Sequence, residues 1–217
     1  QSLRMSGEQK LKEGGSICQS VESTNKSEVI FLTDKTQAYK CRLHEFDDGK
    51  ASLLGDYLPQ KLQMSEGEHV RFLVLPGNYQ GYLLYVYENG KAAKIPVKSF
   101  DTKSNRRRLT GAYCDRSPLV AAIHLEEEGE VAIYSTDGRM LLLNTAMVAP
   151  KATRSSQGVA VMALKKNKVV KQVLPKAQAG IVNESRYRTR TLPAAGALLR
   201  AEDAQEKQLT LEDTESR

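Results

Sequence analysis

Two clusters of basic side chains have the residue types and spacing for one kind of chemistry, the binding of an anionic partner. The chain of 217 residues has 32 Lys and Arg against 26 Asp and Glu, a formal net charge of +6. Residues 91–110 contain seven basic residues and one acidic residue, and residues 139–190 contain eleven and one. Segregated charge of this kind produces a surface potential of one sign. The alternative interpretation is a set of solvated faces that keep the protein soluble.

The Cys and His side chains of the sequence do not have the spacing of a catalytic or metal-binding site. Cys41 and His44 lie three residues apart on one expected strand, so they point to opposite faces and cannot share a metal ion. His69 and His124 are isolated strand residues, for which a structural role is the ordinary interpretation. The sequence has neither a Gly-x-x-x-x-Gly-Lys-Ser/Thr loop for nucleotide phosphates nor a Gly-x-Ser-x-Gly elbow. We therefore expect no catalytic residue, no metal site and no cofactor site.

The basic clusters belong to a repeat of about fifty residues. Three stretches align without gaps, namely 28–46, 82–100 and 130–148. Each has a run of β-branched and aromatic residues, a polar turn and a second alternating run. Asn89-Gly90 and Asp137-Gly138 are strong signals for two-residue hairpin turns, which need positive φ at both central positions. Each repeat is therefore expected to begin with a β-hairpin.

Every predicted hairpin is followed by a polar, basic connection and another apolar strand. These strands are expected at 69–76, 118–126 and 158–165, with one more at 168–175. A hairpin with one further strand cannot bury its own apolar face, whereas repeats stacked side by side or radially can. The sequence therefore predicts an all-β array of about four units. We expect repeats near 28–76, 82–126 and 130–175, with terminal half-repeats at 15–22 and 187–200 that together complete one further unit.

The ends of the chain differ in character from the repeats. We expect residues 1–200 to form one domain and residues 201–217 to form an acidic, flexible tail, which either competes for the basic surface or only adds solubility. No apolar run approaches the roughly 20 residues of a membrane-spanning helix. Three cysteines without paired spacing suit a reducing compartment. Because the chain starts at Gln1 without a secretory segment, we expect it to be a piece of a longer gene product.

The ordered repeats resemble the C-terminal domain of the A subunit of bacterial type II DNA topoisomerases, that is, DNA gyrase and topoisomerase IV. Residues 82–100 and 130–148 look like two of that family's repeats. Residues 152–165 look like its basic loop, which leads to a glycine and a Val/Met/Leu strand. Residues 188–199, together with 208–212, are similar to the ends of such subunits. The likeness covers residues 15–212.

The resemblance implies a β-pinwheel, a propeller-like disc of about four four-stranded blades in which neighbouring blades exchange strands. It also implies a non-catalytic domain that binds and bends duplex DNA and presents it for strand passage. The implied partners are double-stranded DNA without sequence preference, the rest of the A subunit and the B subunit, in the bacterial cytoplasm at the nucleoid. ATP and Mg²⁺ would be used elsewhere in the parent enzyme, so no cofactor is implied for this fragment.

On this interpretation the basic loops form a DNA-binding rim. Duplex DNA carries one negative charge about every 1.7 Å of its axis, so a basic surface gains affinity by counterion release without contacting bases. If the blades are radial, matching loops project on the same side of the disc. The candidate DNA-binding residues are Lys50, Lys61, Lys103, Arg106, Arg107, Arg108, Lys151, Arg154, Lys165, Lys166 and Lys168.

Two features depart from the family's pattern. Gyrase A subunits carry a Gln-Arg-Arg-Gly-Gly-Lys-Gly box, and the nearest match here, at 12–17, keeps Gly14 and Gly15 without the flanking basic residues. This favours a topoisomerase IV-like or divergent gyrase-like role over full DNA wrapping. The stretch 186–189 superficially resembles the sequence around the family's DNA-cleaving tyrosine, but its context differs, and we interpret Tyr187 as a strand residue with a packed ring and a solvated hydroxyl.

The alternative function is a propeller-like protein-interaction module whose basic loops bind an acidic partner. Propeller-type folds commonly serve as platforms for other proteins, and a fold alone does not settle function.

Overall fold

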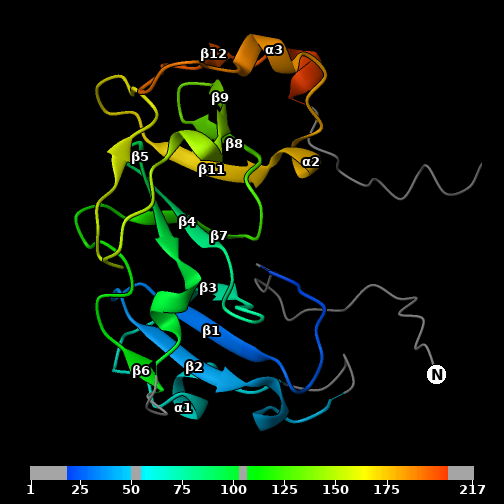
Figure 1. The fold of residues 1–217 in the computed structure, drawn as a ribbon, viewed down its shortest axis with the longest axis vertical. Helices are drawn as coiled ribbons and strands as arrows, with labels where there is room; N and C mark the ends of the chain where they lie inside the picture. The colour runs from blue at the N-terminus through cyan, green and yellow to red at the C-terminus, as the bar shows by residue number, and fades with distance from the viewer. Residues whose placement is uncertain (1–18, 50–54, 103–106, 205–217) are drawn as a thin grey trace, which may run out of the picture. The chain divides into compact units, whose positions relative to one another are not determined.

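The computed structural model describes residues 19–49, 55–102 and 107–204. These residues form three four-stranded antiparallel sheets and a few short helices (Figure 1). They divide into two compact units, one made of the described residues within 1–78 and 103–112, the other of those within 79–102 and 113–217. The predicted all-β fold is confirmed, and a single domain over 1–200 stays a prediction.

The first unit contains one sheet, in the order β3-β1-β2-β6. β1 and β2 form the hairpin predicted for the first repeat, and β3 pairs with the other edge of β1. Side chains from β1 and β2 form its core, including Val29, Phe31 and Tyr39. The elements of this unit are β1 (Glu28–Thr33), β2 (Ala38–Arg42), η1 (Leu43–Glu45), α1 (Leu58–Lys61), β3 (Val70–Val74) and β6 (Arg108–Leu109).

The second unit contains two sheets, in the orders β10-β5-β4-β7 and β11-β8-β9-β12. The hairpins β4–β5 and β8–β9 are those predicted at 82–100 and 130–148, and β7 and β11 pair with the first strand of each. One core connects the two sheets, with Leu84 from β4 and Ile133 from β8 among its buried residues. The elements of this unit are β4 (Tyr82–Tyr87), β5 (Lys91–Pro96), η2 (Val97–Phe100), β7 (Leu119–Leu125), β8 (Glu130–Ser135), β9 (Arg139–Asn144), η3 (Thr145–Met147), β10 (Val159–Ala160), β11 (Val170–Pro175), α2 (Lys176–Ala179), α3 (Glu184–Tyr187), β12 (Ala197–Leu198) and η4 (Ala201–Asp203).

The short edge strands are exchanged between successive repeats. β6 follows β5 along the chain yet pairs with β2, and β10 follows β9 yet pairs with β5. This is the strand exchange of the predicted β-pinwheel. β12 pairs with β9 and completes the third sheet. Residues 15–18 lie outside the described ranges, and the further unit predicted from 15–22 and 187–200 stays a prediction. The described residues therefore make three sheets rather than four.

Two local predictions are wrong for identifiable reasons. The strand predicted at 158–165 is limited to β10, because the amides of Val161 and Met162 both turn to the carbonyl of Gly90, at 2.9 and 3.0 Å. The turn between β8 and β9 needs positive φ at one position rather than two. Gly138 has a φ of 74°, whereas Asp137 is not in the left-handed region.

None of the helices in the described ranges is long and apolar enough to cross a membrane.

The C-terminal segment is fixed to the second unit through a buried carboxylate. Asp203 is only 3% exposed, and it accepts hydrogen bonds from the Tyr187 hydroxyl at 2.7 Å and from the amides of Val182 and Asn183 at 2.7 and 3.1 Å. Burial raises the pKa of Asp203, but these hydrogen bonds outweigh it and lower the pKa from 3.8 to about 2. Residues 201–203, which were predicted to belong to the flexible tail, form η4, and residues 205–217 lie outside the described ranges.

Tyr187, which was predicted to be a strand residue with a solvated hydroxyl, takes part in the same contact with Asp203. Its ring is buried, as predicted, but it belongs to α3 rather than to a strand. Its hydroxyl donates to Asp203 and accepts from the amide of Arg200 at 3.2 Å, so it is not a solvated group.

Asp203→Ala is expected to lower the free energy of unfolding by about 3 kcal/mol, because two amides and a buried hydroxyl would lose their acceptor. Glu202→Ala, at an exposed neighbour, should cost less than about 1 kcal/mol. Urea denaturation followed by circular dichroism measures both, and equal losses would contradict the assignment. Since the folded-state pKa is the lower one, the contribution of Asp203 is present above pH 3.8 and disappears as the pH falls towards 2.

Candidate nucleic-acid interface

The basic loops that precede β6 and β10 occupy equivalent places in their repeats. Each loop lies between a 3-10 helix, η2 or η3, and the exchanged strand. That the loops share one rim stays a prediction. Three candidate residues, Lys50, Lys103 and Arg106, lie outside the described ranges.

Arg108 on β6 is held by groups of its own unit. Its guanidinium donates to Gln37 Oε1 and, at 3.2 Å, to Ser65 Oγ. It also lies over the Tyr39 ring, 5.9 Å from the ring centroid. A guanidinium with this many partners is positioned by the sheet and would have to break contacts to bind a phosphate fully.

The other candidate cations of the first unit are also paired. Arg107 contacts the Glu45 carboxylate at 2.7 Å, although its side chain is 67% exposed. Lys61 contacts Asp56 at 3.4 Å and lies 5.5 Å from the Phe46 ring centroid. Exposed ion pairs of this kind are weak, so a polyanion can compete for both cations.

Arg154 has a structural role in the second unit. It donates to the carbonyl of Ser99 at 2.7 Å, and its guanidinium lies 5.3 Å from the Phe100 ring centroid. These contacts attach the loop before β10 to η2. Arg154 is therefore a positioning residue for this loop rather than an open cation.

Three of the predicted lysines gather in one exposed turn between β10 and β11. Lys165, Lys166 and Lys168 are all exposed, and the amide of Lys168 closes the turn on the carbonyl of Lys165 at 3.1 Å. Their ammonium groups make no ion pair with a carboxylate in the described part of the chain. This turn supplies cations that are open to an anionic partner.

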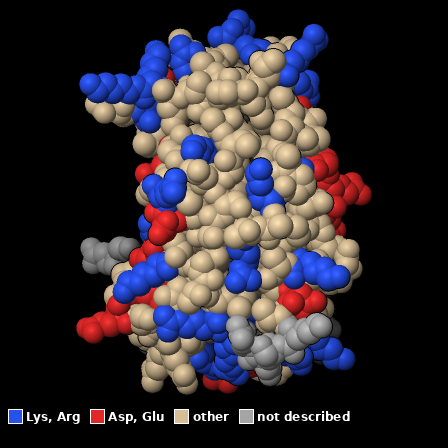
Figure 2. Space-filling model, turned by 60° about the vertical axis from the view of Figure 1, so that its left-hand side comes forward, with Lys and Arg blue, Asp and Glu red and all other residues tan. Residues whose placement is uncertain are grey.

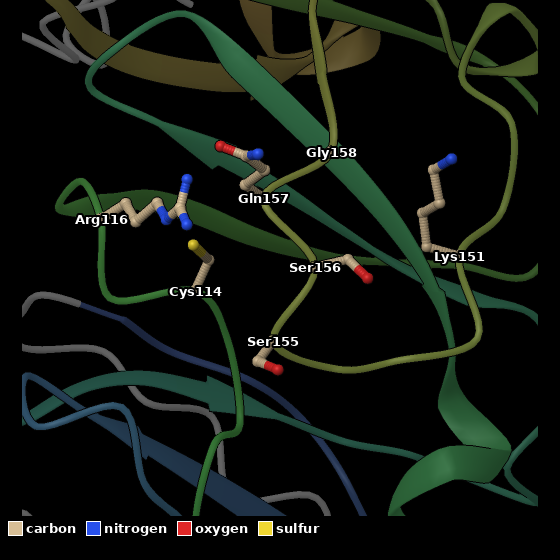
Figure 3. A pocket seen from close by; sticks show the side chains of 7 residues that line it. All are labelled: Cys114, Arg116, Lys151, Ser155, Ser156, Gln157 and Gly158. Carbon is tan, nitrogen blue, oxygen red and sulfur yellow. The ribbon is translucent and has the colours of Figure 1, made fainter.

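Lys151 lines an open pocket of about 450 Å³, which we call the Arg116 pocket (Figure 3). Two segments form its walls, one before β7 and one before β10. Its lining residues are Cys114, Arg116, Lys151, Ser155, Ser156, Gln157 and Gly158. Arg116 was not predicted as a site residue, because it stands alone next to Asp115 and outside both basic clusters.

On the face drawn in Figure 2, Lys and Arg side chains are spread among uncharged atoms, and Asp and Glu side chains also reach the surface. The basic residues are thus dispersed over this face.

The cysteine and histidine side chains singled out in the sequence have the following surroundings. Cys41 is buried in the core of the first unit, and burial raises the pKa of its thiol to about 12, whereas His44 is exposed in η1. His69 contacts Asp34 at 3.0 Å, and His124 contacts the carbonyl of Gln80 at 2.8 Å. Within the described ranges, no group of three or more His, Cys, Asp or Glu residues could hold a metal ion.

Comparison with curated proteins gives type II topoisomerase A subunits. The chain is 25% identical over 157 residues to the DNA gyrase A subunit of Mycoplasma genitalium, a match that covers 71% of this chain and 18% of the relative. It is 23% identical over 149 residues to the topoisomerase IV A subunit of Staphylococcus aureus, which covers 67% and 19%. The chain thus spans less than a fifth of the length of these relatives. No family model matches it.

Solved structures show the same fold. The C-terminal domain of a DNA topoisomerase IV superposes with a TM-score of 0.67 at 19% identity, over 80% of this chain and 58% of that one. The C-terminal domain of a DNA gyrase A subunit gives 0.59 at 18% identity, over 81% and 60%. The ParC C-terminal domain of E. coli gives 0.64 at 14% identity, over 88% and 84%. The predicted resemblance and the β-pinwheel fold are confirmed.

Proposed function

We propose that this chain is the accessory domain of a type II topoisomerase A subunit, and that it binds and bends duplex DNA without catalysing a reaction itself. The observation that carries the proposal is the open lysine turn of residues 165–168 on a fold shared with the C-terminal domains of gyrase and topoisomerase IV A subunits. Unpaired ammonium groups on an exposed turn can approach phosphates without losing an internal partner.

The proposed mechanism uses charge and curvature rather than base recognition. Cations on successive basic loops would contact phosphates along one side of the duplex, and each contact would release condensed counterions. Bending 20–30 base pairs costs on the order of 1–6 kcal/mol, which additional phosphate contacts offset. The bent duplex would be presented to the catalytic region as the segment to be passed.

The proposed partners, compartment and cofactors are inferred from the similarity to topoisomerase A subunits. The partners would be duplex DNA, the rest of the A subunit and the B subunit, in the bacterial cytoplasm. ATP and Mg²⁺ would act elsewhere in the parent enzyme, so the proposal assigns this chain no cofactor and no catalytic residue.

Binding to a labelled duplex is expected to be independent of sequence and to weaken steeply with salt. If Lys151 and the three turn lysines each neutralise one phosphate, the affinity should fall about 150-fold between 50 and 200 mM salt. Fluorescence anisotropy with two duplexes of unrelated sequence measures both properties. A gain or loss of writhe in DNA minicircles, measured with a nicking-closing enzyme, tests bending.

The matched variant replaces Lys165, Lys166 and Lys168 with glutamine. It should keep its fold, because the three side chains are exposed, and its salt slope should fall by about 2.7. An absence of binding at low salt would reject the proposed function, and binding of an acidic protein instead would support an interaction module.

A further inference from the structure

The Arg116 pocket collects hydrogen-bond donors that have no partner of their own. The side chains of Arg116, Lys151, Ser155 and Ser156 make no hydrogen bond or ion pair with another described residue. In contrast, Arg107, Arg108 and Arg154 are all engaged within their own unit. No carboxylate is among the residues that line the pocket. Its chemistry is therefore cationic and donor-rich, and an anion with several acceptor oxygens is its natural ligand.

We propose that the Arg116 pocket binds a phosphate group, and that a DNA strand supplies it. The identity of the strand rests on the proposed function, whereas the phosphate chemistry rests on the pocket alone. Arg116 and Lys151 lie at opposite ends of the pocket, with the loop of residues 151–158 between them (Figure 3). Arg116 offers a planar fork that suits two phosphate oxygens, and Lys151 adds a compact point charge.

Gln157 is oriented to add a further donor. Its Oε1 accepts a hydrogen bond from Lys91 Nζ at 2.9 Å, so its amide NH₂ is the end left for another partner. The hydroxyls of Ser155 and Ser156 lie on the same loop. Neutral donors beside two cations favour a phosphate oxygen over a simple halide ion, because they add directed hydrogen bonds to the charge.

Both walls of the pocket are fixed to the β4–β5 hairpin. The amide of Cys114 donates to the Tyr87 hydroxyl at 3.0 Å, which positions the wall that carries Arg116. The amide of Lys151 donates to the carbonyl of Lys94 at 2.8 Å, which positions the start of the loop. β10 pairs with β5 at the other end of the loop. The pocket is therefore preorganised, and binding a phosphate would order few additional groups.

The test compares the double variant Arg116→Gln/Lys151→Gln with the charge-matched control Lys98→Gln/Lys171→Gln, both in the full chain. Lys98 and Lys171 are exposed cations of the same unit that do not line the pocket. Because the pocket is proposed to hold one phosphate, the pocket variant should reduce the salt slope of duplex binding by about 0.9, which corresponds to about an 8-fold weaker affinity at 0.1 M salt. The control should weaken binding less than about threefold, since general screening alone acts on it. Equal weakening by the two variants would overturn the proposal.

A second measurement separates the pocket from the proposed function. Inorganic phosphate, titrated against chloride at matched ionic strength, should shift the amide NMR signals of residues 155–158 in the natural chain but not in the pocket variant. If the natural chain binds no duplex but shows these shifts, the proposed function fails while the phosphate pocket stands, with free phosphate as its source. If no shift is seen and the pocket variant binds duplex like the control, the pocket proposal fails.

Discussion

Gly158→Ala is expected to lower the free energy of unfolding by about 4 kcal/mol, the largest effect of a single methyl group that we predict for this chain. Gly158 precedes the exchanged strand β10 and has a φ of 73°. A Cβ atom at this position would lie 1.9 Å from the carbonyl oxygen of Ala92 on β5. Because that oxygen belongs to a strand inside a sheet, it cannot move aside without disturbing the ladder.

The matched control is Gly138→Ala, which separates backbone strain from steric overlap. Gly138 has nearly the same φ, 74°, but a Cβ there meets no atom within 4 Å. Gly138→Ala should therefore lower the free energy of unfolding by only about 1–2 kcal/mol, the strain of an alanine in the left-handed conformation. Urea denaturation midpoints measure both losses, and similar values would show that the close approach to Ala92 has little effect.

Glu128→Ala is expected to lower the free energy of unfolding by about 2–3 kcal/mol, because it leaves a buried ammonium without its carboxylate. Lys94 on β5 is 3% exposed in its side chain, and it donates to Glu128 and, at 3.1 Å, to the carbonyl of Thr145. Thr145 also donates from its hydroxyl to Glu128. This group of three residues joins the two sheets of the second unit.

Lys94→Met is the informative comparison for this ion pair. Glu128 is 45% exposed, so without Lys94 it would stay hydrated, and the loss should be less than half of that for Glu128→Ala. Calorimetric melting of the two variants gives the ranking, and a larger loss for Lys94→Met would contradict it.

The pH dependence provides a second check on Glu128. Burial raises its pKa, but the hydrogen bonds from Lys94 and Thr145 outweigh burial and place the pKa below 4.5. The stabilisation is therefore present above pH 4.5 and is lost as the pH falls through the lowered value. The difference between the natural chain and Glu128→Ala should shrink in that acidic range.

The runs of β-branched and aromatic residues, with the polar turns that follow them, by themselves determined the repeating hairpins. Residues 82–87 and 130–135 have the β-branched and aromatic runs of buried strands, and Gly90 and Gly138 end the turns that follow. These signals are local, because a strand's two-residue period and a turn's backbone conformation depend on neighbours in the sequence. The resemblance to topoisomerase A subunits, and with it the strand exchange, depended on the order of these same repeats.

Only the tertiary structure decided which charges are open. The sequence grouped Arg107, Arg108 and Arg154 with Lys165 as equivalent cations. The three arginines bind partners 43 to 71 residues away along the chain, whereas Lys165 makes no such contact with a described residue. Nothing in the sequence singles out Arg116. It lines a pocket only because a loop about 40 residues further along the chain packs beside it. The physical reason is that the amino-acid sequence fixes the charge of a side chain, whereas tertiary contacts fix its exposure. A side chain's charge is set by its type, but its partners are set by which distant segments fold against it.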